Sequence, residues 1–243
     1  MKIALLGYGK MGTAIDDLIK KKYAKQYEVI LRSDSANAHS FSTDALSAAD
    51  VAIEFTKPQA AIANIEKCFE ANVPVVVGTT GWYGKLKYIT ELAQQKNQAL
   101  FYGSNFSIGM NLFFQVNQQL AQLMNDHKTY TPKIEETHHK EKRDAPSGTA
   151  ITLAEDIVWR MKRLDDWTDD EDNDNPDKLS VIAHRSQDDV KGVHSITYTS
   201  PMDTIKIKHT AHTRDAFAFG AITAANWLKD KKGVFTMKDL LNA

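Results

Sequence analysis

The 243-residue sequence has little cysteine, little excess charge of either sign and no long apolar run. Its single cysteine, Cys68, excludes an intrachain disulfide, which favours a reducing compartment and predicts a cytoplasmic protein. Lys and Arg number 30 against 31 Asp and Glu, so no global basic field attracts nucleic acid. No apolar run approaches the roughly 20 residues that span a bilayer, and the first residues carry no secretory signal. We therefore expect no nucleic acid and no membrane as partner.

Glycine is also sparse, with 12 residues, but three glycines have the spacing Gly7-x-Gly9-x-x-Gly12. An apolar run from Lys2 precedes them, and an amphipathic segment follows to about Lys21. A strand, this motif and a helix predict a dinucleotide-binding turn, in which the first glycine turns the chain, the second admits the pyrophosphate and the third packs helix on strand. The residues expected to contact the cofactor here are Gly7, Tyr8, Gly9, Lys10, Met11 and Gly12.

The end of the second expected strand, 28–31, bears on the choice between NADPH and NADH. NAD-specific folds often carry an acidic residue at this point, whereas this sequence has Arg32. Arg32, assisted by Lys10, could pair with the 2′-phosphate of NADPH; alternatively it covers the adenine face. Asp34 could still reach the ribose, so the sequence favours NADPH and leaves NADH use open.

Strands and helices alternate through the first half of the chain. Apolar runs at 51–55, 73–77 and 99–102 are each separated by a helical segment, which predicts a parallel sheet. Ligands bind at the carboxyl ends of strands in such sheets. We therefore expect Gly78, Thr79 and Thr80 on the nicotinamide side of the cofactor.

The second half predicts a different architecture. A long helix at 110–124 is followed by strands at 179–185, 194–199 and 204–210, a series typical of an antiparallel sheet with one solvated face. A helix at 216–229 should pack back on the first domain. The predicted fold class is α/β, with an N-terminal Rossmann-type parallel sheet and a second α+β domain built on a largely antiparallel open sheet. The expected domains are 1–106 plus 215–243 for dinucleotide binding, and 107–214 for substrate binding and oligomerisation.

Residues 165–177 hold eight acidic side chains and begin like a calcium-binding loop. The glycine at position six and the glutamate at position twelve of such a loop are missing. We expect a solvated, mobile loop.

Proton donors concentrate between Glu135 and Ala150. Imidazole titrates near neutrality and a partly desolvated ammonium can donate a proton, so His138 or His139 with Lys142 could protonate a substrate. On composition alone, such a cluster is more often a solvated loop. A metal site made of both histidines and a nearby glutamate is not expected, because adjacent strand residues point to opposite faces.

The turn that follows these donors suits an anion. Ser147 or Thr149 can cap a helix expected from Ala150 to Lys162. The amide groups at such a helix N-terminus favour a carboxylate.

As one block, this segment resembles the substrate-site signature of dihydrodipicolinate reductases. The family pattern E-x-H-H-x-x-K-x-D-A-P-S-G-T-A is matched from Glu136 to Ala150, and an acidic-Phe-Thr-basic-Pro segment is matched from Glu54 to Pro58. The resemblance extends over essentially the whole chain. One departure is the glycine motif, in which many members space the first two glycines one residue wider.

The resemblance implies reduction of an unsaturated cyclic dicarboxylate, 4-hydroxy-tetrahydrodipicolinate or dihydrodipicolinate, by NADPH or NADH in diaminopimelate and lysine biosynthesis. It implies His138 and Lys142 as the acid/base pair and a homotetramer joined through the strands between Leu179 and Thr210. It places Arg214 and Phe217 near the substrate. The implied substrate-carboxylate ligands are His139, Ser147, Gly148 and Thr149. Further implied cofactor contacts are Gly103, Ser104, Asn105 and Phe106.

Two other functions were weighed against this one. Another Rossmann dehydrogenase of amino-acid metabolism, of the aspartate or homoserine type, would lack the His-His-x-x-Lys block. A protein that senses NAD(P)H without turnover would not need converging proton donors.

Overall fold

The computed structural model describes residues 1–34, 42–213 and 215–242, which form two compact units. The first unit comprises Met1–Asn111 and Asp215–Ala243, and the second comprises Leu112–Arg214. The first boundary lies after Asn111, where the sequence predicted it after Phe106. The expectation for Arg214 lies outside the described residues.

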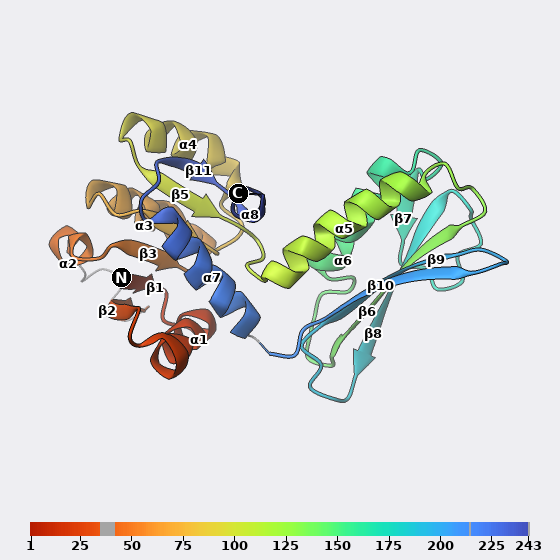
Figure 1. Cartoon of the computed structure of the whole chain (residues 1–243), viewed down its shortest axis with the longest axis horizontal. Coiled ribbons are helices and arrows are strands. Elements are labelled where there is room, and N and C mark those ends of the chain that lie inside the picture. Colours follow the sequence, from red (N-terminus) through yellow and green to blue (C-terminus); the bar gives the residue numbers. More distant parts are fainter. Residues whose placement is uncertain (35–41, 214, 243) are drawn as a thin grey trace. The chain divides into compact units, whose positions relative to one another are not determined.

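The first unit contains a six-stranded sheet with the order β11-β5-β4-β3-β1-β2 (Figure 1). All neighbouring strands are parallel, which confirms the predicted Rossmann-type sheet. The edge strand β11 was not predicted. The strands are β1 (Lys2–Leu6), β2 (Glu28–Ser33), β3 (Val51–Glu54), β4 (Val75–Val77), β5 (Ala99–Tyr102) and β11 (Gly233–Phe235).

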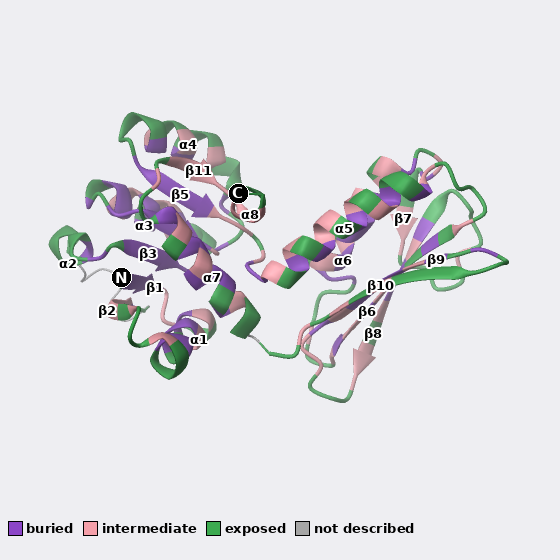
Figure 2. Cartoon of the chain, viewed as in Figure 1, coloured by how far each residue is buried: buried purple, intermediate pink, exposed green. Residues whose placement is uncertain are grey.

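Two hydrophobic cores cover the two faces of this sheet. Successive strand residues alternate between them, as the pleat requires: Ile3 and Leu5 pack in one core, Ala4 and Leu6 in the other. The central strands are therefore buried on both sides (Figure 2). On the first face lie α1 (Lys10–Leu18), its π-helical continuation Ile19–Tyr23, α7 (Asp215–Leu228) and α8 (Met237–Leu241). On the second face lie α2 (Thr43–Ser47), α3 (Pro58–Glu70) and α4 (Leu86–Gln95), the last preceded by the 3₁₀ turn Tyr83–Lys85.

The second unit contains a five-stranded sheet with the order β10-β9-β6-β8-β7. Strand β9 pairs antiparallel with β10 and β6, but β8 pairs parallel with β6 and β7. The sheet is thus mixed, and the prediction of a largely antiparallel sheet was right for only half of the strand pairs. The chain passes from β6 to β7 and β8 through the helix α6 (Gly148–Arg160), and such a helical crossover permits parallel pairing. The strands are β6 (Thr131–His139), β7 (Asp166–Thr168), β8 (Lys178–Ser186), β9 (Val193–Thr199) and β10 (Thr204–Thr210).

The acidic segment differs from the predicted mobile loop. Its first residues form β7, which pairs with β8. Asp170, Asn173 and Asn175 then accept hydrogen bonds from backbone N–H groups two residues later, at 2.9 to 3.1 Å. Asp and Asn side chains form such turns readily. The segment is therefore a short strand followed by consecutive turns.

Helices α5 (Ile108–Met124) and α6 (Gly148–Arg160) accompany the second sheet. Burial alternates along β6: Ile134, Glu136 and His138 are buried, whereas Lys133 and Glu135 are not. His138 therefore lies on the inner face of this sheet. No helix among the described residues is long and apolar enough to cross a membrane.

Candidate functional site

The turn between β1 and α1 has the geometry that the glycine motif predicts. Gly7 has φ +99°, and a Cβ atom on it would lie 2.1 Å from the Phe55 carbonyl oxygen. A Cβ atom on Gly12 would lie 2.2 Å from the Gly7 carbonyl oxygen. At Gly9, by contrast, a Cβ atom would meet nothing within 4 Å. The fold requires glycine at the first and third positions, whereas the space beside Gly9 is open to a ligand.

A cavity of about 440 Å³ opens beside this turn. It lies at the carboxyl ends of β1, β2 and β3, where the strand order reverses and where α/β sheets bind ligands. Its volume is in the range of small-molecule and cofactor sites. Phe55, Thr56 and Lys57 line it and were not among the predicted cofactor contacts. The described residues that line it are Gly7, Tyr8, Gly9, Ser33, Asp34, Phe55, Thr56, Lys57, Ala60 and Asn64.

Arg32 has a partner that the sequence did not suggest. Its Nε and Nη2 atoms donate to the two carboxylate oxygens of Asp16 at 2.9 and 2.8 Å. Asp16 is fully buried and also accepts from Tyr8 and Lys20. The Arg32 guanidinium, helped by Lys20 and Tyr8, holds the pKa of the Asp16 carboxyl well below its usual range. Arg32 is thus first the counter-ion of a buried carboxylate, although its side chain remains 37% exposed.

The loop after β4 supports the cavity wall from behind. Thr79 is buried, and its hydroxyl accepts from the Thr56 amide at 2.7 Å. A Cβ atom on Gly78 would overlap the Phe55 ring. None of the described cavity-lining residues comes from the predicted trio Gly78, Thr79 and Thr80, of which Thr80 is exposed.

Two of the four predicted cofactor contacts in the loop after β5, Phe106 and Asn105, contact other parts of the protein. Phe106 is buried and packs against the rings of Phe55 and Phe101, with centroids 5.7 and 5.9 Å apart. The Asn105 side chain accepts from the Ser107 amide at 2.8 Å. Gly103 and Ser104 keep surface exposure.

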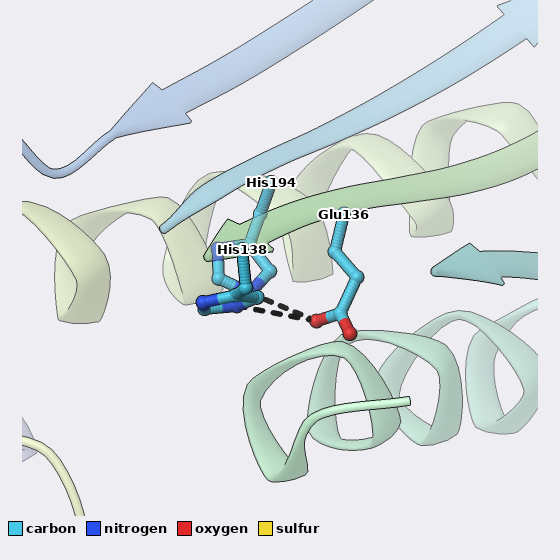
Figure 3. A group of neighbouring side chains, drawn as sticks. All are labelled: Glu136, His138 and His194. Atoms are coloured by element: carbon cyan, nitrogen blue, oxygen red, sulfur yellow. Dashed lines mark ion pairs between the residues drawn. The ribbon is translucent and has the colours of Figure 1, made fainter. Parts of the chain in front are cut away.

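In the second unit, a buried carboxylate contacts two imidazoles. Glu136 and His138 share the inner face of β6, and strand pairing sets His194 of β9 directly opposite Glu136. Glu136 Oε2 lies 3.5 Å from His138 Nε2 and 3.4 Å from His194 Nε2. Figure 3 shows both rings approaching the same side of the carboxylate.

Groups from two further elements hold the same carboxylate. The Ser147 amide donates to Oε1 at 2.9 Å, and the Ser147 hydroxyl donates to Oε2. Arg185 Nη1 on β8 lies 3.8 Å from Oε1. Burial alone would raise the pKa of the Glu136 carboxyl, but the contacts from His138, His194 and Ser147 outweigh it and hold the pKa well below its usual range. Glu136 is therefore an anion at the centre of the cluster.

The predicted substrate ligands do not all converge on this cluster. Ser147 is the N-cap of α6, and its hydroxyl already serves Glu136 and the Ala150 amide. Gly148 is exposed and Thr149 half-buried at the helix N-terminus, and within the described chain their N–H groups have no acceptor. His139 is still part of β6, so its side chain leaves the sheet on the face opposite His138.

Lys142 lies beyond the end of β6 at His139, so the strand does not align its side chain with that of His138. Lys142 Nζ binds the Asp144 carboxylate at 2.8 Å. Arg185 donates to the backbone oxygens of Lys142 and Asp144, at 3.3 and 2.6 Å, and so ties this turn to the sheet beside Glu136.

Sequence reasoning missed Glu136, His194 and Arg185 as site residues. Glu136 could have been found from its even spacing to His138 on a strand. His194 and Arg185 come from other strands, and only the register of the folded sheet brings them in. Glu136, His138 and His194 also bring potential metal-ligand atoms within 4.8 Å of one another. The sequence considered His138 and His139 for such a site instead.

Both halves of the chain match models of one protein family. Residues 1–106 match "Dihydrodipicolinate reductase, N-terminus" and residues 109–241 match "Dihydrodipicolinate reductase, C-terminus". A 4-hydroxy-tetrahydrodipicolinate reductase of Christiangramia forsetii is 43% identical over 243 residues, covering 100% of this chain and 98% of the relative. One from Neisseria meningitidis is 34% identical over 201 residues, covering 81% of this chain and 74% of the relative.

A solved structure shares the fold. It is a dipicolinate-bound dihydrodipicolinate reductase from Paenisporosarcina sp. TG-14, similar to this chain with a TM-score of 0.73 and 20% identity. The match covers 99% of each chain.

Proposed function

The chain belongs to the dihydrodipicolinate reductase family, and from this we propose that it catalyses the NAD(P)H-dependent reduction of 4-hydroxy-tetrahydrodipicolinate to tetrahydrodipicolinate in diaminopimelate and lysine biosynthesis. The observation that carries the proposal is the buried pair of His138 and ionised Glu136, joined through Ser147 to the N-terminus of α6. A proton donor thus adjoins a site suited to a carboxylate. Family membership favours this activity over the aspartate or homoserine dehydrogenase and sensor alternatives. We assign the enzyme to the cytoplasm, a reducing compartment in which a buried free thiol such as Cys68 persists.

The 4-hydroxyl group of the substrate leaves as water to give dihydrodipicolinate, to which the reaction adds a hydride and a proton. The nicotinamide cofactor, held by the glycine loop and the cavity beside it, supplies the hydride when bound. His138, with Lys142, donates the proton, and the Lys142 ammonium favours the negative charge that develops after hydride arrives. The Gly148 and Thr149 amides hold a substrate carboxylate, a role that His139 shares only if a rearrangement brings it to this face.

A coupled assay tests the proposal. Dihydrodipicolinate synthase generates the unstable substrate in the cuvette, and oxidation of NADPH or NADH is followed after this protein is added. We expect oxidation that requires both the synthase product and this protein. A folded protein that binds the cofactor yet oxidises none of it would favour the sensor alternative.

Arg32→Ala should weaken NADPH binding about 10- to 100-fold, the worth of one or two charge-assisted hydrogen bonds, and NADH binding much less. Only NADPH has a 2′-phosphate for the guanidinium to contact. The variant should also be less stable, because the buried Asp16 carboxylate loses its main partner. Dissociation constants for both cofactors and a thermal melt measure the two effects.

A double variant separates affinity from stability. Adding Asp16→Asn to Arg32→Ala removes the unpaired buried charge, so the melting temperature should recover while discrimination between the cofactors stays lost. Equal losses for NADPH and NADH in both variants would leave Arg32 with a structural role alone.

We also propose a homotetramer joined through the second sheet. Its edge strand β10 offers unpaired backbone groups, Ile205 on β10 is 39% exposed, and the adjacent Met202 is 74% exposed. Such an edge is suited to pairing with another chain. Light scattering at micromolar concentration should give four times the chain mass, and a monomer there would contradict the proposal.

A further inference from the structure

We propose that Glu136 is a positioning residue for the reductase reaction: its carboxylate orients the ring of His138 for proton transfer, with His194 and Ser147 holding the carboxylate in place. The inference rests on the proposed function, since His138 is the proton donor there. Neither Glu136 nor His194 was predicted from the sequence as a site residue.

The orientation of the His138 ring carries the first step. Its Nε2 atom is buried, makes no hydrogen bond within the described chain, and lies at ion-pair distance, 3.5 Å, from Glu136 Oε2. A carboxylate on one ring nitrogen selects the tautomer with its proton there and stabilises the imidazolium. The other nitrogen, Nδ1, is then the atom that exchanges a proton with substrate.

Gly192 lies beside the edge of the His138 ring that carries Cε1 and Nδ1. A Cβ atom on Gly192 would lie 3.0 Å from His138 Cε1 and 3.5 Å from Nδ1. Gly192 also has φ +156°, a conformation that favours glycine. A glycine at this position therefore leaves room beside the Nδ1 edge of the ring that any larger side chain would fill.

The rigidity of Glu136 carries the second step. Its carboxylate is fully buried and receives two hydrogen bonds from Ser147, the N-cap of α6. His194 Nε2, at 3.4 Å from Oε2 and 3.3 Å from the Ser147 oxygen, closes the group. The Ser147 amide, the Ser147 hydroxyl and His194 fix the position of the carboxylate. The carboxylate therefore sets the orientation of the His138 ring.

The choice of partners carries the third step. Burying an ion pair costs free energy that an apolar contact would not, so structural need alone is a weak reason for it. The groups that face Glu136 and His138 are His194 on β9, Arg185 on β8 and the uncharged Ser147 before α6. Imidazole is the side-chain type best suited to exchanging a proton with a substrate, and two of the partners are imidazoles.

Glu136→Gln should lower kcat about 10- to 100-fold, the usual cost of losing a positioning partner, with KM and cofactor affinity little changed. Without the anion the proton donor loses its proton more easily, so the alkaline limb of the pH–kcat profile should move to lower pH. Glu136→Asp keeps the charge and should restore the position of that limb even where kcat stays reduced. The matched control is Glu135→Gln, one residue earlier on the opposite face, which should keep both kcat and the limb.

A second measurement is made on the wild-type cluster. The ¹⁵N shifts of imidazole nitrogens in the wild-type protein report the tautomer, and the His138 signals are assigned by their loss in His138→Gln. We expect neutral His138 to carry its proton on Nε2. A proton on Nδ1 would overturn the proposal, also where Glu136→Gln fails to fold.

Different results would refute the reductase activity and the positioning role of Glu136. A wild-type protein that is inactive in the coupled assay refutes the proposed function. An active wild type whose Glu136→Gln variant keeps both kcat and its alkaline limb refutes only the positioning role.

Discussion

Gly9→Val should abolish binding of the reduced nicotinamide cofactor and leave the fold intact. The Gly9 backbone is extended and a Cβ atom there meets nothing within 4 Å, so valine is accommodated in the empty protein. In the complex, the side chain would keep the pyrophosphate from the amides at the start of α1. Losing two charge-assisted hydrogen bonds of about 1.5 to 3 kcal/mol each weakens binding about 10² to 10⁴-fold. Fluorescence titration with NADPH and NADH measures the loss.

Gly84→Val is the matched control, because Gly84 also has open space beside it but lies outside the cavity lining. It should bind both cofactors as the wild type does. Gly12→Ala should instead lower the melting temperature, since its Cβ atom would strike the Gly7 carbonyl. An unchanged dissociation constant in Gly9→Val would refute the assignment of this loop to the cofactor.

His138→Gln and Lys142→Gln should each lower kcat by roughly 10² or more, the scale of general acid catalysis. Cofactor affinity should barely change, because both residues belong to the second unit and the cofactor cavity to the first. Thr149→Ala should instead raise KM, because it removes a hydroxyl that can hold the substrate carboxylate beside the backbone amides, and such a contact binds ground and transition states alike. Steady-state kinetics in the coupled assay separate the two effects.

The neighbours of these residues provide controls. His139→Gln changes an imidazole on the opposite face of β6, and Lys140→Gln removes an exposed ammonium from the following turn. Both should retain kcat. A loss in His139→Gln with normal turnover in His138→Gln would transfer the catalytic role to His139.

Much of the fold followed from local pattern. The strands Ala99–Tyr102 and Thr204–Thr210 were predicted to the residue, because apolar runs and period-two alternation are properties of the segments themselves. The three-residue strands β7 and β11 were missed. One lies among acidic residues, and each exists through pairing with a distant strand rather than through its own propensity.

The site was predictable only as far as one segment reached. Alternation along β6 separates His138 from His139, as expected. Lys142 lies beyond the end of this strand, so alternation does not place its side chain. His194 and Arg185 depend on the register of β6 with β9 and β8, which one sequence does not reveal. The ion pair of Arg32 with Asp16 could not be predicted, because Asp16 is a helix residue whose burial is a tertiary property.

The order in which the chain leaves the ribosome matters because the first unit is built from two separated segments. One core of its sheet is completed by Ala218, Ala221 and Leu228 of α7, and its edge by β11. At about 5 to 20 residues per second, synthesis of residues 112–214 takes about 5 to 20 s. During that time α7 is missing from the apolar face of this sheet. The contiguous second unit can already fold. The cofactor-binding unit therefore matures last although its first strand is made first, and a chaperone that shields the face bearing Ile3 and Leu5 would act in this interval.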